Sequence, residues 1–273
     1  MSRSPSLRPA AGAAVALAFA AAAGTALADP ALPPPAAMPL PKGDFVLDLG
    51  LAAGVRPRYP GAEDFVVRPR PLVGVERLTL PVVGVVADGP AEGVFVYPAF
   101  RVDGERKTSD HPDLAGMRDV DWAMGLGLGA GVNRGDWRAF VEVLAGVKGY
   151  SGLIARAGAD YLWSPSPRTV MAVGPRIDLA GRDFSRTWFG VTPAEAAGSG
   201  GALSAYDPKG GLASAGLALS WGRAINDRAM LNVEAGWDRR LGDIKDSPLV
   251  ARGSRDAAFV TTGLTWRFGF GGT

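Results

Sequence analysis

The sequence predicts an all-β fold, a transmembrane antiparallel up-and-down β-barrel of about 12 strands, with 10 strands as the alternative. Three observations predict this class. Apolar residues alternate with polar or small ones in many runs of about 9–13 residues, and a tilted membrane-spanning strand needs ~9–11. Six of the seven tryptophans stand at the ends of these runs, where membrane barrels carry aromatic girdles. A secretory signal precedes the first run.

Residues 1–28 have the features of a secretory signal peptide. Arg3 and Arg8 supply the positive charge, an alanine-rich apolar stretch follows, and Ala26-Leu27-Ala28 fits the cleavage pattern, so we expect cleavage between Ala28 and Asp29. The apolar stretch is short for a membrane anchor, which is the alternative. Without Arg3 and Arg8, 27 of the 29 basic residues remain against 27 acidic ones. This balance gives no reason to expect a nucleic-acid partner.

Residues 29–43, "DPALPPPAAMPLPKG", contain six prolines. Such a composition favours an extended chain without secondary structure. We therefore expect a solvated periplasmic spacer here, and a barrel over residues 44–273. No later stretch has the ~18 consecutive apolar residues of a membrane helix.

Period-two alternation then divides the chain into strands. For example, Trp137, Ala139 and Val141 share one face of their run, while Arg138 and Glu142 share the other. The predicted strands are 44–55, 65–76, 79–88, 93–102, 120–132, 136–148, 152–163, 168–180, 210–222, 228–239 and 257–268. Single-chain bacterial barrels use even numbers, so one strand is miscounted. The ambiguous stretch is 77–92, which can hold two short strands.

The connections alternate in length through the second half of the chain. Short turns are expected at 133–136, 164–168 and 223–227, and longer loops at 56–64, 103–119, 181–210 and 240–256. Outer-membrane barrels have short periplasmic turns and long external loops. The last strand then runs back to the periplasm. A secreted β-sandwich or lipocalin-like barrel is the alternative fold, but its strands would be shorter and its inner face less charged.

Charged side chains lie on the faces opposite the apolar stripes, which places them in the barrel lumen. The residues that we single out as lumen charges are Arg68, Arg70, Arg138, Glu142, Arg156, Asp160, Arg176, Asp178, Glu234 and Arg267. A barrel of this size has limited interior space. Opposite charges there are expected to pair and partly fill the lumen, and a narrow selective pore is the alternative.

Catalytic chemistry has little support in the composition. Cysteine is absent and His111 is the single histidine, so we expect no metal site. Residues 125–130 fit G-x-G-x-x-A but lie inside an alternating strand, whereas a dinucleotide site needs a strand followed by a helix. His111 lies in a predicted external loop, where a solvated histidine is the simplest interpretation. We expect no catalytic residues, no cofactor and no enzymatic activity.

Four stretches, taken in order, resemble the MipA/OmpV family of MltA-interacting outer-membrane proteins. They are "GLAAGVRPRYPGAEDFVVRPRPLVGVE" (50–76), "LAGMRDVDWAMGLGLGAGV" (114–132), "FGVTPAEAAGSGGALSAYDPKGG" (189–211) and "LGDIKDSPLVARGSRDAAFVTTGLTWRF" (241–268). The third is the most specific, and the residues of this family-motif loop are Trp188, Phe189, Gly190, Val191 and Tyr206.

The resemblance implies a barrel in the Gram-negative cell outer membrane that acts as an envelope scaffold. Its partners would be a lytic transglycosylase and a peptidoglycan synthase, besides membrane lipid, lipopolysaccharide and the barrel-insertion machinery. Porin-like conduction of small solutes and adhesion are the alternatives. We expect a monomer.

Two details remain as expectations. Loop 187–211 should fold into the barrel mouth and pack against Arg176 and Tyr206, because its apolar residues suit no solvated tip. Barrels of this type usually end on an aromatic residue, but here Gly271-Gly272-Thr273 follows Phe270. The insertion signal would then be Phe268 or Phe270, or would be weakened.

Overall fold

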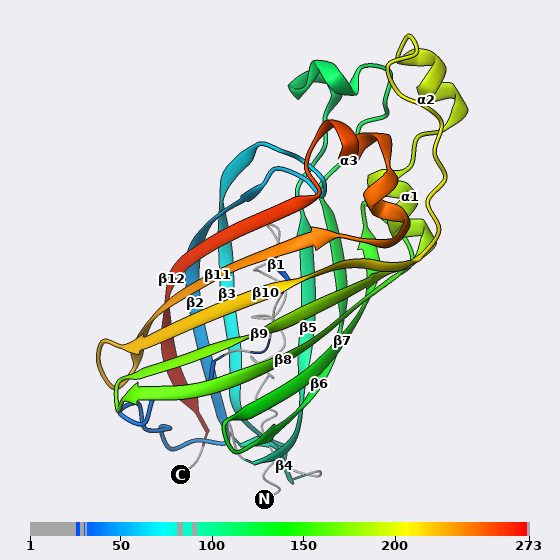
Figure 1. Ribbon diagram of the computed structural model, residues 1–273. Helices are drawn as coiled ribbons and strands as arrows, with labels where there is room; N and C mark the ends of the chain where they lie inside the picture. Colours follow the sequence, from blue (N-terminus) through cyan, green and yellow to red (C-terminus); the bar gives the residue numbers. More distant parts are fainter. Residues whose placement is uncertain (1–25, 28–29, 31, 81–83, 89–91, 272–273) are drawn as a thin grey trace, which may run out of the picture.

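Ten strands of 11 to 16 residues build the wall of the protein in the computed structural model (Figure 1). They are β2 (Phe45–Pro57), β3 (Phe65–Leu80), β5 (Gly93–Asp103), β6 (Ala123–Arg134), β7 (Trp137–Lys148), β8 (Leu153–Ser166), β9 (Thr169–Ala180), β10 (Gly211–Ala224), β11 (Ala229–Arg240) and β12 (Asp256–Phe270). The structure describes residues 26–27, 30, 32–80, 84–88 and 92–271. The predicted cleavage site, Ala28 and Asp29, lies outside these residues and stays a prediction.

Two short strands complete the described sheet, β1 (Ala26–Leu27) and β4 (Gly84–Asp88). The sheet thus has 12 strands in the order β1-β5-β6-β7-β8-β9-β10-β11-β12-β2-β3-β4, all paired antiparallel. The up-and-down fold predicted from the alternation is confirmed. Ten of the twelve strands have membrane-spanning length, which agrees with the alternative number of 10, because β1 has two residues within the predicted signal peptide and β4 has five. The ambiguous stretch 77–92 contains the end of β3 and its short hairpin with β4.

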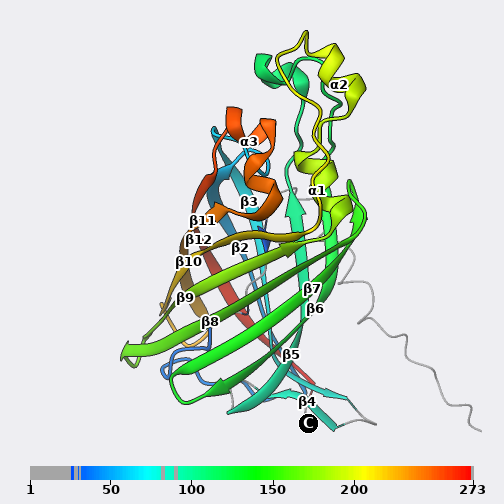
Figure 2. The ribbon, with the colours of Figure 1, turned by 45° about the vertical axis from the view of Figure 1, so that its right-hand side comes forward.

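The first and last long strands meet, since Val55 of β2 pairs with Val260 of β12. The sheet curls around a lumen, and a seam remains between β3 and β5 (Figure 2). Within the described ranges no ladder joins these two strands, and β1 pairs with β5 through Ala26 and Val102. Because β1 falls in the predicted signal peptide, the mature chain would leave that edge of β5 without this partner.

An apolar belt covers the outside of the wall. Leu51, Val67, Val94 and Leu128 have exposed fractions of 62%, 70%, 82% and 66%, which would be unfavourable in water for so many large side chains. The belt matches the lipid-facing surface of an outer-membrane barrel. No described helix is long and apolar enough to cross a membrane.

Aromatic rings gather where several strands end. Trp137 and Tyr161 contact each other with ring centroids 5.2 Å apart, and Tyr161 stacks on Trp163 at 6.0 Å. Phe270 is the last residue of β12 and stacks on Phe268 at 6.3 Å. The closing strand therefore ends on an exposed aromatic residue, and the glycine tail lies beyond it. This arrangement favours Phe270 as the terminal insertion signal.

Short helices occur only in the loops among the described residues. They are η1 (Thr108–Asp110), η2 (Pro112–Leu114), α1 (Arg182–Phe189), α2 (Pro193–Gly198), η3 (Gly242–Asp246) and α3 (Pro248–Arg252). In Figures 1 and 2 they stand together at one end of the barrel, which we call the loop end. The opposite end, with the short connections and the C-terminus, is the turn end.

The glycines of β6 leave room for aromatic side chains inside the lumen. A Cβ atom on Gly129 would lie 2.2 Å from the ring of Tyr97, and one on Gly125 would lie 2.2 Å from the Tyr150 hydroxyl. Tyr97 in turn donates a hydrogen bond to Glu142 at 2.8 Å. The glycine run that resembles a nucleotide motif is therefore a packing surface, since its missing side chains are replaced by rings from neighbouring segments.

Replacing Gly129 with valine should displace the Tyr97 ring and break its hydrogen bond to Glu142. We expect the free energy of unfolding to fall by ~1–3 kcal/mol, the usual cost of overfilling a packed interior. Urea titration of the protein in lipid vesicles, followed by tryptophan fluorescence, measures this change. Gly135→Val and Gly93→Ala would be poor controls, because these glycines have φ values of 58° and 116°, which other residues rarely adopt. Ala139→Val, on the outer face, is the suitable control and should be nearly neutral.

Candidate functional site: a charged barrel lumen and its two ends

Five connections at the loop end pack into one body, which we call the cap. It consists of residues 58–64, 104–122, 149–152, 181–210 and 241–255. The cap and the adjoining strand ends share a hydrophobic core in which Trp188 and Phe189 are 0% and 1% exposed. Its other members include Tyr59, Leu114, Met117, Val120, Tyr150, Phe184, Val191, Leu203, Ile244, Leu249 and Val250. The long loops are therefore ordered and mutually supporting.

Helix α1 carries the aromatic part of this core. Phe184, Trp188 and Phe189 are all buried, and Phe184 makes an edge contact with Tyr150 at a centroid distance of 5.0 Å. Positions 184 and 188 lie one turn apart, so they share one face of the helix. That face is turned toward the barrel mouth and the neighbouring loops.

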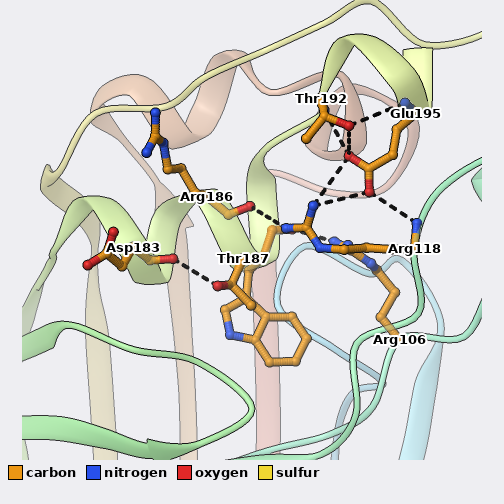
Figure 3. A network of polar contacts seen from close by, with 8 residues as sticks. Arg106, Arg118, Asp183, Arg186, Thr187, Thr192 and Glu195 are labelled. Carbon is orange, nitrogen blue, oxygen red and sulfur yellow. Dashed lines mark hydrogen bonds and ion pairs between the residues drawn. The ribbon is translucent and has the colours of Figure 1, made fainter. Parts of the chain in front are cut away.

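Helix α2 begins with a capping box (Figure 3). The Thr192 backbone N–H donates to Glu195 Oε2 at 2.8 Å, and the Glu195 backbone N–H donates to Thr192 Oγ1 at 3.2 Å. Glu195 also accepts hydrogen bonds from the backbone and guanidinium of Arg118, at 3.1 and 3.2 Å. One carboxylate thus joins α2 to the loop between β5 and β6.

Burial raises the pKa of Glu195, but the hydrogen bonds from Thr192 and Arg118 outweigh it and hold the pKa below its ordinary value. The ionised form is therefore favoured in the folded cap. The stabilisation that ionised Glu195 gives to the folded cap is fully present above the unfolded pKa of ~4.3. It is lost as the pH falls through the lower pKa of the folded state.

We accordingly expect the α2 region to loosen when the pH is lowered from 6 to 3. Glu195→Gln should lose about 1 kcal/mol of local stability at pH 6, the typical value of a helix cap, and should show less change with pH. Hydrogen exchange of the backbone amides at 192–199, corrected for intrinsic rates, measures this. Glu63→Gln, at an exposed position of the same cap, is the control. Equal pH dependence of wild type and Glu195→Gln would contradict the assignment.

Arg106 is fully buried inside the cap. Its Nη1 donates to the backbone carbonyl of Trp188 at 2.7 Å. Arg106 is labelled in Figure 3. Burial lowers the pKa of Arg106 to about 10. The guanidinium fixes the C-terminal end of α1 over the barrel, because the last carbonyls of a helix need donors from elsewhere.

The family-motif loop is held down from several sides. Val191 pairs with Tyr206 in a β-bridge, Ser247 Oγ donates to the Phe189 carbonyl at 2.6 Å, and Tyr206 Oη donates to the Asp243 carbonyl at 2.7 Å. Gly190 ends α1 and is buried.

The expected packing of this loop against Arg176 is not what the structure shows. Arg176 lies in the wall, donates to Asp160 at 2.8 Å and stands over the Phe140 ring at 4.9 Å. The loop finds its partners in the other cap segments instead, because its aromatic residues can be buried there without meeting a charged wall.

A triad of charges lies on the inner side of the wall below the cap, on the neighbouring strands β7, β8 and β9. Asp160 is 0% exposed and accepts from Arg138 at 2.7 Å and from Arg176 at 2.8 Å. Asp178 accepts two bonds from Arg156, at 2.7 and 3.0 Å. Charge-assisted bonds of this kind hold neighbouring strands β7, β8 and β9 together from the inside.

Further pairs lie on the other side of the lumen. Arg267 donates to both oxygens of Asp48, at 2.8 and 2.6 Å, and Arg70 lies 2.6 Å from Glu234. Arg68 is half-buried at the rim and donates to the Arg58 carbonyl at 3.3 Å. Of the predicted lumen charges, the structure thus joins Arg138, Asp160 and Arg176 in the triad and pairs Arg156 with Asp178. It places Arg68 apart at the mouth.

The Arg70–Glu234 pair separates two cavities, since both residues line both of them. The loop-side cavity holds about 670 Å³ and the turn-side cavity about 840 Å³, each partly open to solvent. Sequence reasoning did not identify Arg56, Arg101 and Arg240, which also line the loop-side cavity. Arg101 and Arg240 lie near strand ends where loops begin, so alternation alone gives a weak signal there.

The N-terminal segment packs at the turn end. Met38 is 3% exposed and packs with Leu32, Val170 and Met230. The Ala37 backbone N–H donates to the Pro167 carbonyl at 2.7 Å, and Arg267 donates to the Met38 carbonyl at 3.2 Å. Residues 32–43 are therefore not the solvated spacer that the proline content predicts. Apolar Leu32 and Met38 fill the opening, while the prolines keep the backbone extended.

A sequence-family model described as "MltA-interacting protein MipA" matches residues 49–268, most of the chain. The chain belongs to the MipA family. No curated protein matches it. The four stretches that resemble the family all lie within or at the start of the matched range, and the resemblance is confirmed. With its apolar belt and β-barrel architecture, this MipA-family chain is an outer-membrane barrel protein.

Solved outer-membrane barrels are similar at low identity. Neisserial surface protein A (NspA) is 9% identical with a TM-score of 0.28, over 83% of this chain and 98% of that one. The NanC porin is 8% identical with a TM-score of 0.35, over 81% and 98%. OprG from Pseudomonas aeruginosa is 13% identical with a TM-score of 0.23, over 84% and 98%. The fold described above rests on the strands and ladders of the MipA-family chain itself.

Proposed function

We propose that this protein is a non-enzymatic scaffold of the cell envelope, a barrel with an obstructed lumen that contacts peptidoglycan-remodelling enzymes at its turn end. The observation that carries the proposal is this obstruction. The N-terminal segment packs at the turn end, the Arg70–Glu234 pair separates the two lumen cavities, and the cap packs at the loop end. We expect such a barrel to offer surfaces rather than a passage. The name of the matching family model supports a lytic transglycosylase as the partner.

The turn end suits such contacts because many charged side chains are exposed there. Basic residues there are Lys42, Arg134, Arg168, Arg223 and Arg228, and acidic ones include Asp44, Glu92, Asp136 and Asp227. A mixed charged surface of this kind is typical of the rim of protein interfaces and sets partner choice. Ala36 and Pro39 are exposed beside it, so the folded N-terminal segment forms part of the same face.

Binding of a lytic transglycosylase from the same bacterium tests the proposal. Lys42→Glu, Arg168→Glu and Arg228→Glu together should weaken binding to the detergent-solubilised barrel at least about tenfold. The matched control reverses three charges on the cap, Arg182→Glu, Arg252→Glu and Arg255→Glu, and should bind normally. No binding by wild type, or loss only in the cap variant, would reject the proposed contact face.

The second candidate function is a narrow channel, which the two lumen cavities favour. Planar-bilayer recordings separate the two functions. The scaffold with an obstructed lumen predicts no reproducible conductance steps from the wild-type protein. Regular steps that disappear when the lumen pair is removed by Glu234→Arg would support the channel and reject the obstructed lumen.

A further inference from the structure

We propose that the loop-side cavity is a binding site for a small oxyanion, such as a carboxylate or phosphate, with Arg56 as its principal ligand. The proposal goes beyond the scaffold function and does not depend on it. It rests on an excess positive charge in the cavity and on the position of the Arg56 guanidinium.

The charges that line the cavity do not cancel. Five arginines face four acidic residues there, and each acid has its own arginine: Arg70–Glu234, Arg101–Asp103, Arg156–Asp178 and Arg240–Asp238. Arg56 remains as the fifth arginine. Among the described residues no carboxylate lies within ion-pair distance of it. Its charge is therefore available to an anion that enters the cavity.

The contacts of Arg56 leave its donors in the cavity. Its guanidinium stands over the Phe259 ring at 5.4 Å, and Nη2 lies 3.5 Å from Thr261 Oγ1, at the limit of a hydrogen bond. Stacking uses the flat face of a guanidinium, while its N–H groups point outward in the plane. Those groups can bind two oxygens of one carboxylate or phosphate.

Arg240 is also part of the cavity lining, where its Nη1 donates to Asp238 at 2.9 Å. Arg240 is therefore already paired, which leaves Arg56 as the principal ligand.

The pyrrolidine and aromatic parts of the wall limit the size of the ligand. Pro57, Tyr59, Pro60 and Phe259 line the cavity on the loop side, and Tyr59 belongs to the cap core as well. The site therefore lies where the cap meets the barrel. A bound anion would link the two by contacting arginines of the wall just beneath cap residues.

Isothermal titration calorimetry of the detergent-solubilised protein tests this inference, with sodium acetate and sodium phosphate as separate probes at constant ionic strength set by chloride. Wild type should bind at least one of them saturably. Arg56→Gln should raise the Kd at least about tenfold. The Kd of Arg56→Lys should lie between those of wild type and Arg56→Gln, because lysine keeps the charge but lacks the planar guanidinium that binds two oxygens at once. Binding of acetate alone or phosphate alone identifies the anion class.

Arg239→Gln is the matched control, since it removes the same charge from an exposed residue outside the cavity. Its Kd should stay within about twofold of wild type. The heat-dependent mobility of each variant in gel electrophoresis shows that the barrel is folded. No saturable binding by folded wild type, or equal affinities of wild type and folded Arg56→Gln, would overturn the site.

Discussion

Asp160→Ala should cost the barrel ~3–5 kcal/mol of its free energy of unfolding, because the substitution leaves Arg138 and Arg176 buried without their shared carboxylate. The two guanidiniums are 4% and 6% exposed, so water can compensate little of the lost interaction. Stacking on Phe140 would remain but cannot replace the charge. Urea unfolding in lipid vesicles measures the effect.

Asp256→Asn is the control for this prediction. Asp256 also pairs with an arginine, Arg239, but their side chains are 43% and 52% exposed and 3.4 Å apart. Exposed pairs contribute ~0–1 kcal/mol. Similar losses in Asp160→Ala and Asp256→Asn would mean that the lumen triad does not stabilise the wall.

Trp188→Ala should disrupt the cap while the barrel stays folded. Removing a fully buried tryptophan typically costs ~3–5 kcal/mol, and here it removes the centre of the core that joins α1 to the other loops. The Trp188 backbone carbonyl, which accepts a hydrogen bond from Arg106, would also no longer be held in place. We expect loop 187–211 to become sensitive to protease on intact cells, with unchanged heat-dependent mobility of the barrel.

Thr187→Ala serves as the neighbouring control, because the Thr187 hydroxyl bonds back to the Asp183 carbonyl within α1. It should resist protease as wild type does. Rapid cleavage of wild-type loop 187–211 would contradict the packed cap, and equal resistance of Trp188→Ala would show that its core is not needed for order.

The wall could be predicted from the sequence because alternation is a local property. Leu128 and Val141 belong to apolar stripes and are exposed on the outside, while Arg138 and Glu142 on the opposite parity are buried inside. The cap could not, since Arg106 and Trp188 meet across 82 positions and no local period relates them. The prediction for the N-terminal segment was wrong because its prolines indicate only the shape of the backbone. The packing of Met38 and Leu32 determines where that backbone lies.

The sequence also did not indicate which charged residues of the lumen pair with each other. Parity places Asp48 and Arg267 on inward faces, but only the pairing of the first long strand with the last brings them to 2.6 Å across 219 positions. The same holds for Arg70 and Glu234, which meet across two intervening strands. Contacts between residues so far apart in the sequence depend on the pairing of all the strands between them.

The cap described above has a kinetic consequence. Its core draws on connections as far apart as Tyr59 and Val250, so bringing them together in an unfolded chain would carry the full entropy of closing a long loop. The strands remove that cost as they assemble, and the cap core can form only afterwards. A conformation-specific antibody against the cap would therefore recognise finished barrels and ignore stalled assembly intermediates, which makes this surface a reporter of completed biogenesis.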